Sequence, residues 1–385
     1  MAMLKKTIKV MHIQLFSHMT GVQRVAYDEM KTVLTTTSHI EYYLMCQSKG
    51  VLTKKCDELG VVFFENKWLR RNISIIYDIA ALLRAVIVIL KVKPNVVHTH
   101  SSKTGIIGRL AAFMCRTPTI IHTVHGFAFP AAKNAIRKNF YIVCEILVGL
   151  ITDRLIVLSG SDFQIATQTL RMRESKIMLL KNAIDQNLYN SLNRSSKTGG
   201  GVFKFAVIGR LAEQKNQSLL VKAFASTRIR CKRECELLIV GDGEDREKIV
   251  SLVKECKCET SVKILGWRND IPKILDEVDA VVVPSLWEGM SLTVIEAMAS
   301  GVPVIASDIP GNTCLISHKK TGLLFKSSNV ASLTDAMLEI LESHELRSEI
   351  SKNSIQYVKS GHNLVDRSSV LINLYEHGCE LARRN

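Results

Sequence analysis

The segment Glu288-Gly-Met-Ser-Leu-Thr-Val-Ile-Glu296 lies between a short run of β-branched residues and an apolar helical stretch. Gly289 gives the backbone freedom to turn, and the amides that follow it are expected to point outward at the start of a helix. Outward amides at a helix start bind phosphate, and here they belong to Met290, Ser291 and Leu292. The segment therefore predicts a phosphate-binding turn.

Glu296 follows two helical turns later, between Ile295 and Ala297 on an otherwise apolar stretch. An unpaired carboxylate in such surroundings is costly, so it needs hydrogen-bond donors or a cation. The hydroxyls of a ribose would supply donors, and a structural ion pair is the alternative.

A second phosphate-binding loop is predicted at Gly209-Arg-Leu-Ala-Glu-Gln-Lys215, directly after another strand-like run. Arg210 offers a planar fork of donors and Lys215 a mobile point charge, a combination that suits phosphate oxygens. The two cations are predicted to clamp a diphosphate; a solvated helix start is the alternative.

Strand-like runs alternate with helical stretches along the chain, which predicts parallel sheets with helices on both faces. In the first half the predicted strands are Ile8–Leu15, Glu41–Met45, Val61–Phe64, Val96–His100, Thr119–Val124 and Arg154–Leu158. In the second half they are Phe203–Ile208, Glu236–Val240, Val262–Leu265, Ala280–Val283 and Pro303–Ala306. Ligands of such sheets bind at the carboxyl ends of the strands, where both predicted loops lie.

The 385 residues suit two domains better than one. We predict an α/β protein with two facing Rossmann-like, doubly wound domains, 1–190 and 202–364, and a ligand-binding cleft between them. Residues 191–201, rich in Ser and Gly, are expected to form the linker. Residues 365–385 are periodic and charged, which predicts a C-terminal helix that can pack back on the N-terminal domain.

The formal net charge of +15 arises mainly in the first half, where residues 1–190 hold 25 Lys and Arg against 12 Asp and Glu. A basic surface attracts nucleic acid, anionic lipid or phosphorylated ligands. Nucleic acid is disfavoured, because no zinc-finger, basic-zipper or aromatic RNA-binding motif is present. Residues 67–71 and 133–140 mix cations with apolar side chains, so they either rest on an anionic membrane or form a solvated basic face.

Neither a signal peptide nor a membrane span is predicted. The apolar N-terminal run is better interpreted as a first strand, and the stretch Ile73–Lys93 is interrupted by Asp78 and Arg84. Ten scattered cysteines fit reduced thiols. A four-thiolate zinc site at Cys231, Cys235, Cys256 and Cys258 is disfavoured, because the spacings lack the usual paired two-residue gaps. A cytoplasmic location is therefore expected.

Six segments together, in order along nearly the whole chain, resemble glycosyltransferase family 4 of the GT-B fold, in particular members that build bacterial surface polysaccharides. They are His98–Arg109, His122–Phe129, Gly209–Lys215, Val240–Glu244, the pair Glu288/Glu296 and Gly301–Asp308. The combination is far more specific than any one of these motifs.

The resemblance implies retaining transfer of a sugar from a nucleotide diphosphate sugar, without a metal or other cofactor. It implies that the cations of the Gly209 loop neutralise the leaving diphosphate. It also implies that Glu288 contacts the donor sugar, Glu296 the ribose and the backbone at Trp267 and Arg268 the base. Gly21 would let the backbone of the N-terminal domain approach the diphosphate, and His125 would lie beside the anomeric carbon and the acceptor hydroxyl.

Four histidines, at positions 98, 100, 122 and 125, can also be interpreted as a metal cluster, because His-x-His on a strand places both rings on one face. We expect no metal there, since neither segment offers an acidic partner.

The expected function is transfer of a hexose or N-acetylhexosamine, most simply from a UDP-sugar, to a polyprenyl-diphosphate-linked oligosaccharide during O-antigen, capsule or exopolysaccharide synthesis. The expected location is the inner face of the cytoplasmic membrane, with peripheral attachment. Two alternatives remain. A UDP-sugar 2-epimerase would exchange the proton at C2 of the sugar in deuterated water, and a non-catalytic nucleotide-sugar-binding subunit would bind UDP tightly without turnover.

Overall fold

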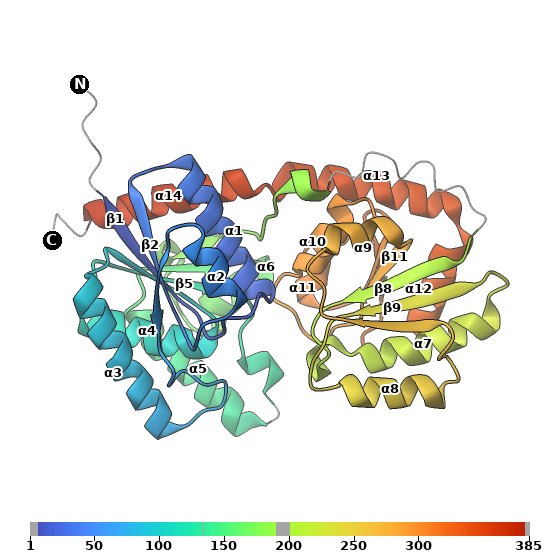
Figure 1. Ribbon diagram of the computed structural model, residues 1–385, viewed down its shortest axis with the longest axis horizontal. Coiled ribbons are helices and arrows are strands. Elements are labelled where there is room, and N and C mark those ends of the chain that lie inside the picture. The colour runs from blue at the N-terminus through green and yellow to red at the C-terminus, as the bar shows by residue number, and fades with distance from the viewer. Residues whose placement is uncertain (1–6, 133, 190–200, 382–385) are drawn as a thin grey trace. The chain divides into compact units, whose positions relative to one another are not determined.

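The structure, a computed structural model, describes residues 7–132, 134–189 and 201–381. It consists of two compact units, each with its own parallel sheet (Figure 1). The first unit contains residues 1–182 and 364–385, and the second contains residues 183–363.

The first unit is built on a seven-stranded sheet in the order β3-β2-β1-β4-β5-β6-β7, with every neighbouring pair parallel. Its strands are β1 Ile8–Ile13, β2 Ile40–Cys46, β3 Val62–Glu65, β4 Val96–His100, β5 Thr119–Val124, β6 Arg154–Val157 and β7 Ile177–Leu179. Its helices are α1 Gly21–Thr36, α2 Val51–Asp57, α3 Ile75–Val92, α4 Ser102–Met114, α5 Ala135–Leu150, α6 Gly160–Gln164 and α14 Leu364–Leu381.

Alternating side chains of the central strands serve two separate cores in the first unit. On one face, Val10 and Val96 pack with Leu371 and Tyr375 of α14, and with side chains of α1. On the other face, Met11, Ile13 and Val97 pack with side chains of α3 and α4. The period of two along the strands thus buries both faces of the sheet, as in a doubly wound fold.

The second unit is built on a six-stranded parallel sheet in the order β10-β9-β8-β11-β12-β13. Its strands are β8 Phe203–Ile208, β9 Cys235–Val240, β10 Val262–Gly266, β11 Ala280–Val283, β12 Val304–Ser307 and β13 Leu323–Phe325. Its helices are α7 Gln217–Arg230, α8 Arg246–Glu255, α9 Ile271–Glu277, α10 Leu292–Ala299, α11 Pro310–Thr313, α12 Val330–Glu342 and α13 His344–Gly361. One core joins the sheet to α7, α8 and α12.

The two parallel sheets agree with the sequence prediction, but the outermost strands β7 and β13 were missed. Each has three residues, which is too short for a period-two pattern to stand out from the surrounding loop. Both lie at sheet edges and pair on one side only.

The division between the units falls at residue 182 and not at the expected residue 190. Residues 183–189 pack on the second unit, where the Ile184 amide donates to His362 and the Gln186 side chain donates to the Val358 carbonyl. The expected linker 191–201 lies outside the described residues except for Gly201. The predicted C-terminal helix is α14, which packs on α1 and on strands β1, β4 and β5 of the first unit.

Within the described part of the chain, we find no helix with the combined length and apolar character that crossing a bilayer demands.

Candidate donor and acceptor sites

The loops after β8 and β9 in the second unit are held together by glycines. A Cβ atom on Gly241 would lie 2.0 Å from the carbonyl oxygen of Gly209, and one on Gly243 would lie 2.3 Å from that of Leu211. Gly209 and Gly241 also have φ values of 151° and 139°, which side-chain-bearing residues avoid. The Val240–Glu244 segment is therefore the support on which the Gly209 loop rests.

Lys215 and Glu288 form an ion pair in the second unit, although 73 residues separate them. The Ser285 hydroxyl donates to the same Glu288 oxygen at 2.7 Å. The pair is largely shielded, with 23% of the Lys215 side chain and 10% of the Glu288 side chain exposed. Since β8 and β11 are neighbours in the sheet, the loops that follow them meet at its carboxyl edge.

Backbone contacts fix this meeting of the two loops. The Leu286 amide donates to the carbonyl of Gln214, whose side chain donates in return to the Trp287 carbonyl. Gly311 completes the support, because a Cβ atom there would lie 2.4 Å from the Glu288 carbonyl oxygen. The backbone that carries Glu288 is consequently fixed by contacts with two other loops, those that follow β8 and β12.

Arg210 and Arg268 lie nearer the surface than Lys215. The Arg210 guanidinium contacts Glu244 at 2.8 Å in a pair that is nearly half exposed, so it is free to exchange partners when an anion arrives. Arg268 binds both oxygens of Asp270, and these bonds lower the pKa of the Asp270 carboxyl to about 2. Trp267, which follows Gly266 at the end of β10, is 46% exposed.

The segment Glu288–Glu296 runs into helix α10, which begins at the carboxyl edge of the same sheet. Its N-cap is Ser291, whose side chain makes no capping hydrogen bond, and Thr293 in its first turn donates to the Ile208 carbonyl at the end of β8. Met290 and Ser291 are buried. Gly289 is not among the glycines with positive φ, so the turn does not use the conformational freedom expected for it. The helix start and the Gly209 loop nevertheless lie together.

Glu296 is 4% exposed and accepts a hydrogen bond of 2.6 Å from the Tyr189 hydroxyl. Tyr189 is buried as well, and it belongs to the segment that follows the first unit in the chain. The phenol hydroxyl is therefore one of the donors that the buried carboxylate needs.

In the first unit, Gly21 is the exposed first residue of α1, which follows β1. His125 follows β5 and precedes Gly126, whose φ of 113° lets the chain turn away directly after the imidazole. Both residues thus lie beyond the carboxyl ends of strands, where the sequence predicted them. The roles predicted for Gly21, His125 and the residues of the second unit remain predictions.

The histidines of the first unit form a chain of imidazole rings. His125 Nε2 lies 3.0 Å from His100 Nδ1, and His100 Nε2 lies 2.9 Å from His12 Nδ1. His98 uses its two ring nitrogens on the Tyr375 hydroxyl and the Thr123 hydroxyl, at 2.9 and 2.7 Å. His122 stands apart, with its Nδ1 2.8 Å from the Thr99 hydroxyl.

Burial keeps these rings neutral. Desolvation lowers the pKa of His12 and of His125 to about 3, with repulsion from Arg367 as a second cause for His125. The pKa values of the His98, His100 and His122 rings are also lowered, first by desolvation. The second cause is the neighbouring histidines for His98 and His100, and Arg109 for His122.

Within the described residues, the one group of potential metal ligands is His12, His98 and His100, whose ligand atoms lie within 4.8 Å of one another. Of the four histidines considered in the sequence, only two therefore belong to this group. His98 would have to give up a hydrogen bond to Tyr375 or Thr123 in order to bind an ion. The expectation of a reaction without metal remains a prediction.

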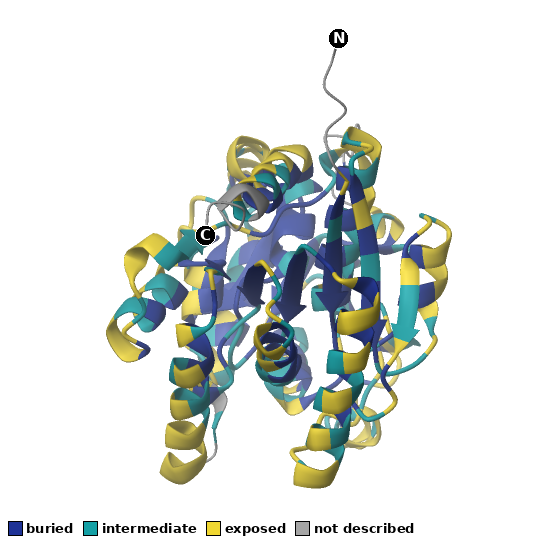
Figure 2. Cartoon of the chain, turned by 90° about the vertical axis from the view of Figure 1, so that its left-hand side faces the viewer, coloured by how far each residue is buried: buried dark blue, intermediate teal, exposed yellow. Residues whose placement is uncertain are grey.

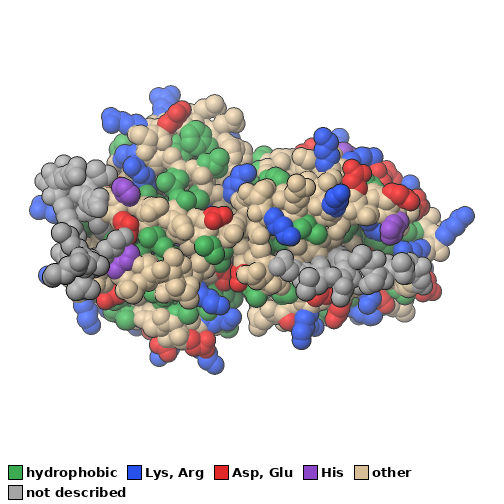
Figure 3. All heavy atoms as spheres, turned by 90° about the horizontal axis from the view of Figure 1, so that it is seen from above, with side chains coloured by type: hydrophobic (Ala, Val, Ile, Leu, Met, Phe, Trp, Pro, Cys, Tyr) green, Lys and Arg blue, Asp and Glu red, His purple; other side chains and the backbone are tan. Residues whose placement is uncertain are grey.

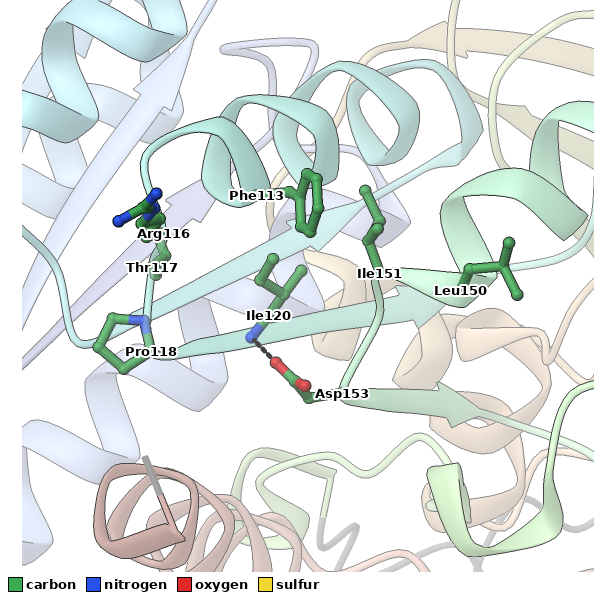
Figure 4. A pocket seen from close by; sticks show the side chains of 8 residues that line it. All are labelled: Phe113, Arg116, Thr117, Pro118, Ile120, Leu150, Ile151 and Asp153. Carbon is green, nitrogen blue, oxygen red and sulfur yellow. Dashed lines mark hydrogen bonds between the residues drawn. The ribbon is translucent and has the colours of Figure 1, made fainter. Parts of the chain in front are cut away.

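A shallow pocket of about 310 Å³ lies at the opposite end of β5 from His125 (Figure 4). Phe113, Ile120 and Leu150 line it together with Arg116, and the Asp153 carboxylate accepts from the Ile120 amide at 2.7 Å. Ligands of parallel sheets bind at the carboxyl edge, so this amino-edge pocket is separate from the predicted site.

Sequence reasoning missed the residues that support the predicted ones. They are Ser285 and Gln214 beside the Lys215–Glu288 pair, Tyr189 at Glu296, and His12 at the end of the imidazole chain. Only for His12 did the sequence contain a pattern that indicated burial. His12 lies in a predicted strand two residues after Val10, so the two side chains share the buried face of that strand.

Two family models match consecutive parts of the chain. The model described as "Glycosyltransferase Family 4" matches residues 15–188, and the model described as "Glycosyl transferases group 1" matches residues 191–357. The matched segments correspond closely to the two units.

Among curated proteins, the UDP-Gal:alpha-D-GlcNAc-diphosphoundecaprenol alpha-1,3-galactosyltransferase of Escherichia coli is 36% identical over 96% of both chains. The N-acetylgalactosamine-N,N'-diacetylbacillosaminyl-diphospho-undecaprenol 4-alpha-N-acetylgalactosaminyltransferase of Campylobacter jejuni is 27% identical over 66% of both chains. Among solved structures, Anabaena Alr3699/HepE in complex with UDP and glucose has a TM-score of 0.80 and 18% identity, covering 96% of this chain and 100% of its own. This likeness shows the GT-B fold.

Proposed function

Because the chain belongs to glycosyltransferase family 4, we propose that it transfers a hexose from a UDP-sugar to a sugar linked through diphosphate to a polyprenyl lipid. UDP-galactose is the donor we propose first, and undecaprenyl-diphosphate-linked N-acetylglucosamine the acceptor. Similarity to the E. coli enzyme supports both choices, since its name specifies them and the two chains match along almost their whole lengths.

The observation that carries the proposal is the Lys215–Glu288 pair beside the start of α10. A cation, an uncapped helix start and a shielded carboxylate together offer groups for a diphosphate and for a sugar hydroxyl. We propose that Lys215 and Arg210 receive the diphosphate with the amides of Gly289, Met290, Ser291 and Leu292. We also propose that Glu288 contacts the sugar.

The remaining donor contacts are proposed by position. Glu296 would bind the ribose beside the Tyr189 hydroxyl, which already donates to it. Trp267 and Arg268 would meet the base from the end of β10. In the first unit, the Gly21 backbone would approach the diphosphate and His125 would act on the reacting sugars.

We further propose that the anomeric configuration is retained and that no metal or cofactor takes part. The E. coli relative makes an alpha linkage, and UDP-galactose carries its sugar in the alpha configuration. Two side-chain cations stand where the leaving diphosphate is proposed, and they can stabilise its charge in place of an ion.

The test is a transfer assay with purified protein, UDP-galactose and undecaprenyl-diphosphate-linked N-acetylglucosamine. We expect release of UDP, an alpha-linked disaccharide lipid by NMR, and an unchanged rate in the presence of EDTA. A panel of other UDP-sugars serves as the control for donor choice. If a protein that binds UDP and is folded consumes no donor, the enzyme proposal is wrong. Exchange at the sugar C2 in deuterated water would identify an epimerase instead.

The lipid-linked acceptor requires that the cytoplasmic enzyme we propose meets a membrane surface, and two helices of the first unit suit that role. Exposed apolar side chains on α3 include Ile76, Ile79, Leu83, Ile87 and Leu90, and those on α5 include Ile136, Phe140, Val143, Leu147 and Leu150. All ten are more than half exposed, at spacings of three and four that align them along one side of each helix. Figure 2 shows the exposed turns of these outer helices in yellow. We name these ten residues the apolar helical face.

Charge favours an anionic bilayer as the surface that this face contacts. Residues 66–116 and 134–152 contain eleven Lys and Arg but two carboxylates, Asp78 and Glu145. Asp78 is paired with Lys103, and Glu145 is buried against Arg109. By contrast, Figure 3 shows cations and carboxylates interspersed on the surface that it presents. Apolar side chains flanked by cations are typical of helices that lie in the lipid interface.

We predict that the double substitution Ile79→Glu with Leu147→Glu weakens binding to vesicles that contain phosphatidylglycerol by about tenfold or more, since a buried large apolar side chain contributes roughly 1.5–3 kcal/mol. Vesicle co-sedimentation measures this. Ile229→Glu, at an 86% exposed position on α7, is the matched control and should bind like the wild type. Equal loss in the control would contradict the role of the apolar helical face.

A further inference from the structure

The imidazole chain His12–His100–His125 joins the candidate catalytic histidine to the centre of the first unit. Its three residues come from β1, from β4 and from the loop after β5, and these strands are neighbours in the sheet. The rings of His12 and His100 stack with centroids 5.0 Å apart, and those of His100 and His125 are 5.3 Å apart. His12 and His100 are fully buried, whereas His125 is partly exposed.

A count of protons constrains this chain. Each neutral imidazole carries one N–H, so three neutral rings carry three. The two ring-to-ring hydrogen bonds use one N–H each, and these two bonds must point in the same direction along the chain. The third N–H therefore lies at one of the two ends, on His12 Nε2 or on His125 Nδ1.

The two ends are not equivalent. His12 Nε2 is buried and has no hydrogen-bond partner among the described residues. A proton there would be a buried, unsatisfied donor, which costs more than an unsatisfied acceptor usually does. His125 Nδ1 belongs to the partly exposed ring, where water or a substrate oxygen can accept its proton. The third N–H is thus favoured on His125.

We infer that His12 and His100 are positioning residues that fix His125 as the Nδ1–H tautomer, so that His125 donates a hydrogen bond to a substrate oxygen and does not act as a base. This inference rests on the proposed function for the role of His125, but the tautomer itself does not depend on it. The Nε2 atom, which a base would use, is occupied by the N–H of His100.

The packing around the chain supports one fixed direction. His98 lies beside both buried rings, with centroids 4.8 Å from His12 and 4.5 Å from His100, but its nitrogens are bound to Tyr375 and Thr123. Its ring nitrogens therefore do not compete for the nitrogens of His12, His100 and His125. The hydrogen bonds between these three rings form one unbranched chain, from His12 through His100 to His125.

The first test needs no substrate, and it uses a variant only to assign the signals. Nitrogen-15 NMR of the full-length, histidine-labelled protein distinguishes a protonated from an unprotonated ring nitrogen, and loss of one set of signals in His125→Gln assigns the ring. We expect Nδ1–H and bare Nε2 for His125. The opposite tautomer overturns the inference, even in a protein that proves to be an active transferase.

The second test compares His12→Asn with His12→Leu. The asparagine amide places an N–H donor where His12 Nδ1 lies, and leucine has none. We expect the leucine variant to show a mixture of His125 tautomers and about tenfold lower kcat, the effect of losing one oriented hydrogen bond in the transition state. The asparagine variant should restore one tautomer and kcat to within about twofold, with the KM for donor unchanged in both.

These outcomes separate the inference from the proposed function. If His125 is the Nδ1–H tautomer but the protein transfers no sugar, the inference about the imidazole chain stands and the enzyme proposal is wrong. If His125 still shows a single tautomer in the folded His12→Leu variant, His12 does not position His125. A thermal melt of each variant shows that it is folded before the spectra are compared.

Discussion

Lys215→Ala and Glu288→Ala are each expected to lower turnover by at least ~10²-fold, the usual effect of removing a charge contact made in a transition state. The two side chains are bound to each other in the unliganded structure. Lys215 therefore exchanges part of its contact with Glu288 for the diphosphate when the donor binds, and Glu288 keeps the Ser285 hydroxyl as a partner. Removal of Lys215 deprives both the phosphate and the carboxylate of a cation.

Steady-state kinetics with UDP-galactose and the lipid-linked acceptor measure the effect. The matched control is Lys263→Ala, which breaks a more exposed ion pair with Glu236 in the same unit and should leave kcat unchanged. Lys215→Arg keeps the charge but not the geometry, so we expect partial activity. If both alanine variants turn over at the wild-type rate, Lys215 and Glu288 do not form the donor site.

The first unit is expected to lose stability steeply below about pH 6.5. Burial lowers the pKa of His12 to about 3, and the pKa values of His98, His100 and His122 are lowered in the same direction. The unfolded chain binds protons at its histidines near pH 6.5, whereas the folded unit does not. Stability is therefore fully present above that pH and decreases as the pH falls.

With the partly exposed His125 left out, the four buried histidines together would cost about 5 kcal/mol between pH 7 and pH 5.5, which is as large as the whole stability of many domains. Urea pulse proteolysis at the two pH values, with peptides identified by mass spectrometry, reports each unit separately. His122→Gln should remove about one of the four contributions, and the exposed His344→Gln should remove none. A first unit that is equally stable at both pH values would show that these rings are protonated without unfolding.

Local sequence determined much of the fold. β-branched runs alternating with helical stretches are a property of neighbouring residues, so eleven of the strands could be placed before any tertiary contact was known. β7 and β13 could not, because three residues at a sheet edge owe their extended form to pairing with the strand beside them. The boundary at residue 182 was missed for a similar reason: residues 183–189 carry no strand or helix pattern and are placed by contacts with the second unit.

The segment Glu288–Glu296 shows which features local sequence can predict and which it cannot. The sequence predicted a helix after Gly289, with phosphate-binding amides at its start and a carboxylate on its apolar side, since each of these depends on residues a few positions apart. Only the tertiary structure decided that Lys215 pairs with Glu288, that Tyr189 donates to Glu296 and that His12 reaches His125 through His100. The order of strands in a parallel sheet decides which loops and which rings become neighbours. That order is set by packing of the whole sheet, and no periodicity along the chain records it.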